Sequence, residues 1–255
     1  MRWVRRREHH PQVEISEKRG VRYMHLGGPA VQSAMRLNAP YELELEYTRA
    51  MMSFLLFHAS PRNLCLIGLG GGSIPKFILR SVPEVRLTVL EINPEVVAAA
   101  RTYFLLPSDD ERLDVLTGDG AAYVYAHPYS QDVLMVDGYD AKRIVEDLAS
   151  PGFYAACIAM LRPGGIALFN LWGSDGSFGR YLTGIMTAFS GRVLQLPSER
   201  KGNIVVLAFR DPPECRFVHL ALSAVTLSDS LGLDFPEFLS RMRNWNPATD
   251  TGFTL

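Results

Sequence analysis

The stretch Leu-Cys-Leu-Ile-Gly-Leu-Gly-Gly-Gly-Ser-Ile, residues 64–74, decides the fold of this chain. Its apolar part predicts a buried strand, and its glycines predict a turn into a following helix. Such a turn leaves backbone N–H groups uncovered beside a ligand at the helix N-terminus. About twenty residues further on, the strand expected at 86–91 ends in Glu91, whose carboxylate suits the hydroxyls of a ribose. The pair predicts a nucleoside-binding α/β domain.

Strand and helix patterns alternate through the middle of the chain. Strands are expected at 63–68, 86–91, 113–117, 132–137 and 165–171, and helices at 73–81, 93–104, 119–126, 151–161 and 176–189. Two later runs, 192–196 and 203–209, predict a closing antiparallel hairpin. The expected fold class is α/β, with a doubly wound, mostly parallel sheet and an antiparallel edge. This layout resembles the Rossmann-like fold of class I S-adenosylmethionine-dependent methyltransferases.

Three parts of the chain are expected. Residues 1–37 predict a small β-rich appendage, a hairpin around a turn at 18–20 followed by a third strand at 30–37. Residues 38–211 form the nucleoside-binding domain, which opens with a helix from Pro40. Residues 212–255 are expected to be a C-terminal extension with one docking helix near 235–243 and a loose end.

Composition narrows the function classes. Lys and Arg number 26 against 27 Asp and Glu, so the net charge of -1 gives no reason to expect a nucleic-acid partner. No apolar run approaches the roughly twenty residues that span a bilayer, so no membrane partner is expected. The three cysteines are far apart and lack metal-site spacing. We therefore expect no metal and a reduced, cytoplasmic setting.

Acidic residues stand at or just after the ends of three expected strands, those at 86–91, 113–117 and 132–137. Asp119, before Gly120, opens a helix, where it suits both a helix cap and an acceptor for an adenine amino group. Asp137 and Asp140 flank a glycine-containing turn at the mouth of the fourth strand. Two carboxylates facing the cleft would attract an ammonium group and accept its proton. The alternative interpretation is an ordinary turn, since Asp and Gly are common turn residues.

In order and spacing, these landmarks resemble the spermidine synthase (polyamine aminopropyltransferase) family over about residues 12–210. Two further matches are Gln32 in the N-terminal strands and Tyr47 at a helix start. The resemblance implies a transferase that moves an aminopropyl group from decarboxylated S-adenosylmethionine to an amine such as putrescine. Methylthioadenosine would leave, without a metal. A homodimer is also implied.

The resemblance further implies a role for each matched residue. The implied catalytic residues are Asp137, Asp140 and Tyr47. The implied residues of the nucleoside site are Gln32, Gly68, Gly70, Gly72, Glu91, Asp119 and Gly120. The implied residues of the amine site are Asp137, Asp140 and Glu199. Within these sets Asp137 takes the amine proton, Glu91 holds the ribose and Asp119 the adenine.

Three positions depart from the family pattern. Gly71 stands where the family usually carries Asp in the glycine loop, Arg49 follows the tyrosine in place of Glu, and Glu199 replaces a substrate-facing Tyr. Gly71 and Arg49 favour an alternative, a methyltransferase that uses intact S-adenosylmethionine. A third hypothesis is a nucleoside-binding protein without catalytic activity.

Overall fold

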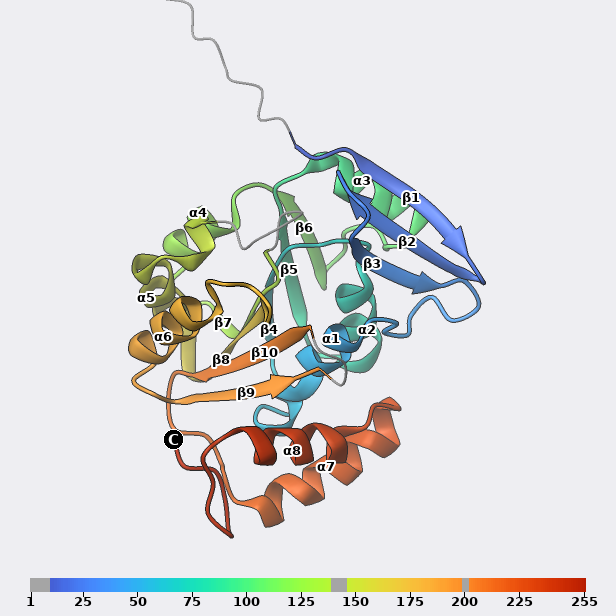
Figure 1. Cartoon of the computed structure of the whole chain (residues 1–255). Helices are drawn as coiled ribbons and strands as arrows, with labels where there is room; N and C mark the ends of the chain where they lie inside the picture. The colour runs from blue at the N-terminus through green and yellow to red at the C-terminus, as the bar shows by residue number, and fades with distance from the viewer. Residues whose placement is uncertain (1–9, 139–145, 199–201) are drawn as a thin grey trace, which may run out of the picture.

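The computed structural model describes residues 10–138, 146–198 and 202–255, and it shows an α/β fold with two sheets (Figure 1). The larger sheet has the order β6-β5-β4-β7-β8-β10-β9. Its strands are β4 (Asn63–Ile67), β5 (Arg86–Glu91), β6 (Leu113–Thr117), β7 (Gln131–Val136), β8 (Leu161–Trp172), β9 (Val193–Pro197) and β10 (Asn203–Phe209). All neighbours are parallel except β10 with β8 and with β9. The predicted fold class is confirmed.

Helices cover both faces of this sheet (Figure 1). One face carries α2 (Ser73–Ser81) and α3 (Pro94–Tyr103), and the other carries α4 (Gly120–Ala126), α5 (Pro151–Met160) and α6 (Phe178–Ala188). Side chains of a strand alternate between the two faces. In β4, Leu64 and Leu66 therefore join one hydrophobic core, while Cys65 and Ile67 join the other. A strand apolar on both faces is typical of a parallel sheet between two helix layers.

The N-terminal strands form a separate antiparallel sheet in the order β1-β2-β3. Its strands are β1 (Val13–Lys18), β2 (Val21–Leu26) and β3 (Val31–Arg36), as the alternating sequence predicts. Met24 and Met35 from this sheet are buried in the same core as Ile74 of α2. The small sheet is thereby fixed beside the glycine loop. The division of the chain at residues 37 and 211 stays a prediction.

The first strand of the large sheet, β4, lies beside β7, and the strand order reverses between them. Ligands of open α/β sheets bind at this reversal, beyond the carboxyl ends of the strands. The two ends approach closely here, since a Cβ on Gly68 would lie 2.2 Å from the backbone oxygen of Asp137. Gly68 also has a positive φ of 92°. Only glycine satisfies both conditions.

The helix predicted from Pro40 begins later. The chain forms turns and irregular backbone before α1 (Glu46–Met51), which continues as a 3-10 helix, η1 (Met52–Leu56). Arg49 explains the difference, because its Nη1 donates to the backbone oxygens of Leu43 and Glu44 at 2.9 and 3.0 Å. These carbonyls are bound by a side chain, so they do not require a helical turn. At the other end of the domain, β8 begins at Leu161 rather than at residue 165.

The prediction for the C-terminal part is wrong in two respects. Two helices are present, α7 (Phe217–Leu231) and α8 (Phe235–Trp245). Helix α8 packs against β9, and α7 packs against α8 and η1 (Figure 1). The end is not loose, because Phe253 is buried against the core. Asn246 covers the edge strand β9: its Oδ1 accepts from Gln195 N and its Nδ2 donates to Gln195 O, at 2.7 and 2.8 Å. An edge strand satisfied in this way is closed to further pairing at that residue.

A second 3-10 helix, η2, covers Glu146–Ala149. Within the described ranges, no helix combines the length and the apolar character needed to cross a bilayer.

Candidate active site

Two cavities meet at the carboxyl ends of β4 and β7. The first has a volume of about 200 Å³ and opens against the glycine loop and the ends of β5 and β7. The second, of about 430 Å³, lies against the start of α1, the end of β8 and the start of β10. The described residues that line both cavities are Gln32, Tyr47 and Asp137. Asp137 is therefore placed where two bound molecules would meet.

Most of the predicted site residues line the first cavity. They are Gln32, Tyr47, Gly68, Gly70, Glu91, Asp119, Gly120 and Asp137. Gly72 is not part of the described lining of either cavity, because it sits behind the loop as the N-cap of α2. Asp140 and Glu199, predicted for the amine site, lie outside the described residues.

Glu91 at the end of β5 is held by the backbone. Its Oε2 accepts from Leu69 N at 3.0 Å and its Oε1 from Asn93 N at 2.9 Å. Burial raises the pKa of Glu91, and these hydrogen bonds oppose the increase. Each carboxylate oxygen can accept more than one hydrogen bond, so the pair can also take the hydroxyls of a ribose. The geometry fits the predicted ribose contact.

Asp119 is the N-cap of α4, as predicted. Its Oδ1 accepts from Ala121 N at 2.8 Å, which satisfies a free N–H of the first helical turn. The side chain also lines the first cavity. Around it the cavity wall is apolar, with Ile67, Leu90 and Ile92. A polar group beside apolar walls fits an aromatic base, and the adenine contact stays a prediction.

Asp137 after β7 is held by side chains. Tyr47 Oη donates to Oδ2 at 3.0 Å, and Asn170 Nδ2 donates to Oδ1 at 2.7 Å. Burial raises the pKa of Asp137, and the two hydrogen bonds oppose the increase. Burial and the adjacent Asp137 raise the pKa of Tyr47 well above its usual value. Tyr47 therefore stays protonated and donates a hydrogen bond to Asp137. A half-buried carboxylate with a raised pKa suits a proton acceptor.

The glycine loop has no room for a side chain at Gly71. A Cβ there would lie 2.7 Å from Cδ1 of Phe104 and 2.8 Å from Oγ of Ser33. The place where the family usually carries Asp is thus filled by two other side chains. Arg49, the second departure, contacts backbone oxygens before α1 and is not part of the described lining of either cavity. An interpretation of Arg49 as a contact for a substrate carboxylate therefore lacks support.

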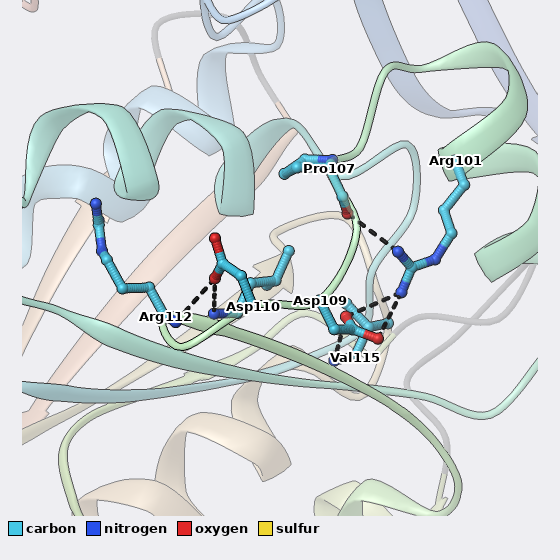
Figure 2. A network of polar contacts seen from close by, with 7 residues as sticks. Arg101, Pro107, Asp109, Asp110, Arg112 and Val115 are labelled. Carbon is cyan, nitrogen blue, oxygen red and sulfur yellow. Dashed lines mark hydrogen bonds and ion pairs between the residues drawn. The ribbon is translucent and has the colours of Figure 1, made fainter.

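Phe104 is the C-cap of α3, and the loop that follows it to β6, the braced loop, is held by polar contacts (Figure 2). Arg101 donates to Pro107 O at 3.1 Å and to both oxygens of Asp109 at 2.9 Å. Asp109 in turn accepts from Val115 N at 3.1 Å. These contacts, drawn in Figure 2, fix the loop at its middle and at β6. The loop is a fixed wall behind Gly71.

A buried lysine joins this wall to the helix that follows the glycine loop. Lys76 of α2 donates from Nζ to Phe104 O at 2.6 Å and to Met35 Sδ at 3.1 Å. Burial lowers the pKa of Lys76 to about 8. The lysine therefore ties α2 to both the braced loop and the N-terminal sheet.

Comparison with known proteins identifies the family. The family model for the spermine/spermidine synthase domain matches residues 44–170. A polyamine aminopropyltransferase from Neisseria meningitidis is 40% identical over 247 residues, which cover 96% of this chain and 94% of that protein. The chain belongs to the spermine/spermidine synthase family. A second family member, from Chromobacterium violaceum, is 38% identical over 94% of this chain and 92% of its own length. The resemblance found in the sequence is confirmed, and membership makes the chain a transferase.

Solved structures support the fold of this family member. A probable spermidine synthase from Corynebacterium glutamicum matches with a TM-score of 0.70 at 21% identity, covering 95% of this chain and 94% of that one. Human methyltransferase-like protein 13, solved in complex with SAH, matches with a TM-score of 0.66 at 24% identity over 74% of this chain and 93% of its own. Both likenesses show a common fold.

Asn170 and Asn203 of this family member were not among the site residues predicted from the sequence. Asn170 lies in β8 and contacts Asp137, and Asn203 opens β10 and donates to Asn170 Oδ1 at 2.8 Å. A signal for Asn170 exists, since it is the polar residue in the otherwise apolar run Ile166–Trp172. Asn203 gives no such signal, because a polar residue after a turn is ordinary. Among the described residues, no group of three His, Cys, Asp or Glu side chains is arranged to hold a metal ion.

Proposed function

We propose that this chain transfers an aminopropyl group from decarboxylated S-adenosylmethionine to an amine and releases methylthioadenosine. The observation that carries the proposal is the position of Asp137. Among the described residues, it is the carboxylate that lines both the nucleoside-type cavity and the second cavity. An acid at this junction can contact the incoming nitrogen while the nucleoside occupies the glycine crevice.

The two cavities suit the two substrates. In the first, Glu91 would hold the ribose, Asp119 the adenine, and the walls at Gly68 and Gly70 would leave the backbone open to the aminopropyl donor. In the second, an amine would lie beside Tyr47 and Asp137. Holding both reactants in line supplies most of the acceleration in a reaction whose sulfonium leaving group is already activated.

The proposed step needs one proton acceptor. The amine nitrogen forms a bond to the methylene carbon beside the sulfonium, the carbon–sulfur bond breaks, and its electron pair stays on sulfur. The nitrogen then carries an extra proton, which passes to Asp137. The raised pKa of Asp137 makes this transfer more favourable than to an exposed carboxylate.

The second cavity favours an acceptor with more than one amine. Its described lining includes Trp172 and two further acids, Glu46 and Glu44, of which Glu44 is already paired with Arg36 at 2.9 Å. Carboxylates and an aromatic face both attract a second ammonium group. Putrescine or a related polyamine is the proposed acceptor, with Asp140 and Glu199 as further amine contacts. A homodimer and a cytoplasmic location are part of the same proposal and rest on the resemblance and the composition.

Product mass tests the proposal. The enzyme is incubated with putrescine and either decarboxylated or intact S-adenosylmethionine, and calorimetry measures the binding of each nucleoside. We expect an added aminopropyl group with the decarboxylated compound. An added methyl group from the intact compound would support the alternative favoured by Gly71, a methyltransferase. Nucleoside binding without turnover on a panel of amines would support a non-catalytic protein.

A further inference from the structure

A chain of hydrogen bonds leads from β10 to the proposed base. Asn203 Nδ2 donates to Asn170 Oδ1 at 2.8 Å, and Asn170 Nδ2 donates to Asp137 Oδ1 at 2.7 Å. Asn170 is 4% exposed, so its amide has little access to water. The antiparallel ladder pairs Asn203 with Trp172, which fixes the two asparagines on neighbouring strands. The three side chains form a hydrogen-bonded chain in which Asn203 donates to Asn170 and Asn170 donates to Asp137.

The direction of these hydrogen bonds depends on the orientation of the Asn170 side-chain amide. An asparagine amide presents an oxygen on one side and an NH2 group on the other, and half a rotation exchanges them. The carboxylate of Asp137 only accepts, so it favours the NH2 group of Asn170. The oxygen of Asn170 then faces Asn203 and requires a hydrogen-bond donor there, because a buried polar atom without a partner is costly. Asn203 supplies that donor.

We propose that Asn203 is a positioning residue of the transfer reaction, which keeps the Asn170 amide turned so that Asp137 receives a hydrogen-bond donor. The proposal rests on the proposed role of Asp137 as proton acceptor. Asn203 also lines the second cavity. Asn203, in the wall of the proposed amine site, is therefore linked to Asp137 through the side-chain amide of Asn170.

The surroundings of Asp137 give the expected direction of the effect. Other acids line the same cavities, Glu91, Asp119 and Asp147 in the first and Glu44 and Glu46 in the second, and His10 lines the first. Of these acids, Glu44 is paired with Arg36 at 2.9 Å, and the cause that favours the protonated form of Asp137 is burial. Tyr47 and Asn170 donate to Asp137 and lower its pKa. If Asn170 turned its oxygen toward Asp137, the hydrogen bond from Asn170 would be replaced by a repulsion between two oxygen atoms, and the pKa of Asp137 would rise.

Two substitutions at Asn203 test this. Asn203→Leu has nearly the same shape but donates nothing, and Asn203→Asp presents an acceptor to Asn170 Oδ1. Asn203→Asp is expected to turn the amide and to move the acidic limb of the kcat/KM profile to higher pH by about one pH unit, which is about tenfold in rate below the limb. Asn203→Leu removes the donor to Asn170 Oδ1 without offering the NH2 group another partner, so its displacement should have the same direction and be smaller. Activity should recover at high pH, and the KM for the aminopropyl donor should stay within about twofold, since Glu91 is untouched. A merely structural role would lower kcat at every pH.

A double-mutant cycle separates the amide from the added charge. In an Asn170→Ala background, Asn203→Leu should leave the pH profile unchanged, because the group through which Asn203 acts is gone. Asn203→Asp should keep only a small displacement from its negative charge. Equal displacements in both backgrounds, or none from either substitution in the wild-type background, would overturn the proposal. Asn203→Leu carries the test if Asn203→Asp fails to fold.

A second measurement does not depend on turnover. NMR titration of the Asp137 side-chain carboxyl in the free enzyme should give a higher pKa in Asn203→Leu than in the wild type. An unchanged titration would refute the positioning role. A titration that shifts as expected in an enzyme that moves no aminopropyl group would support the hydrogen-bond sequence and refute the proposed function. The two failures are therefore distinguishable.

Discussion

Glu91 and Asp137 stand at the ends of two strands of one sheet, β5 and β7, and they are held in opposite ways. Glu91 is buried and Asp137 is half-buried, and burial raises the pKa of both carboxyls. Glu91 accepts from backbone N–H groups of Leu69 and Asn93. Asp137 accepts from side chains of Tyr47 and Asn170, 90 and 33 residues away. Backbone donors come with the fold, whereas side-chain donors can be changed one at a time. The difference suits a fixed binding group and an adjustable base.

The largest effect is expected at the base. Asp137→Asn should lower kcat by about 10³-fold, because an amide cannot accept the amine proton. Binding of the nucleoside substrate, measured by calorimetry, should change by less than about threefold, since Glu91 keeps its contacts. Asp147→Asn is the matched control, because Asp147 lines the same cavity but is exposed. Turnover retained by Asp137→Asn would remove this residue as the base.

The backbone-held acid is expected to affect binding instead. Each oxygen of Glu91 accepts from a different N–H, so Glu91→Gln must turn an NH2 group toward one of them. Affinity for the nucleoside substrate should fall about 10- to 100-fold, and the free energy of unfolding in urea should fall by about 1–3 kcal/mol. The kcat at saturating substrate should change little. The exposed Glu95→Gln serves as control. A fall in kcat as large as the fall in affinity would contradict the proposal that Glu91 acts in binding and Asp137 in the chemical step.

A third prediction concerns the side-chain donor Tyr47. Its hydrogen bond lowers the pKa of Asp137, so Tyr47→Phe should raise that pKa. The proposed reaction requires ionised Asp137, and the acidic limb of kcat/KM should therefore move to higher pH by about one pH unit. Activity well above the limb should return to near the wild-type level. Tyr41→Phe, at a more exposed tyrosine, should leave the profile in place. A displacement of the acidic limb to lower pH would show that the Tyr47 hydrogen bond does not lower the pKa of Asp137.

The smallest effect is expected in the glycine loop. Gly71→Ala brings a methyl group against Phe104 and Ser33, so the loop or the ring must move by a fraction of an ångström. We expect a few-fold higher KM for the nucleoside substrate and a loss of about 1 kcal/mol in unfolding free energy. Phe104→Leu in the same chain should restore part of both. Gly28→Ala, where a Cβ meets nothing within 4 Å, is the control. An unchanged KM would mean that the braced loop yields without cost.

Local sequence patterns predict much of this molecule. The apolar run of β4 and the glycines after it place the crevice. Asn93-Pro94 places the start of α3, since Asn93 accepts from Glu95 N at 3.0 Å. The prediction fails where a distant group replaces a local hydrogen bond, as Arg49 does before α1. It also misses α7, which is covered on one face only. There Leu220 and Ala224 are buried, while Leu222 is 67% exposed.

The sequence by itself determined the order of strands and helices and brought Gly68, Glu91, Asp119 and Asp137 to one edge of the sheet, because the carboxyl ends of parallel strands lie together. Only the tertiary structure decided which side chains donate to Asp137 and that Phe104 and Ser33 fill the space at Gly71. The reason is physical. Strand and helix periods are set by neighbours along the chain, whereas a hydrogen bond between distant segments requires that their packing bring two atoms within about 3 Å.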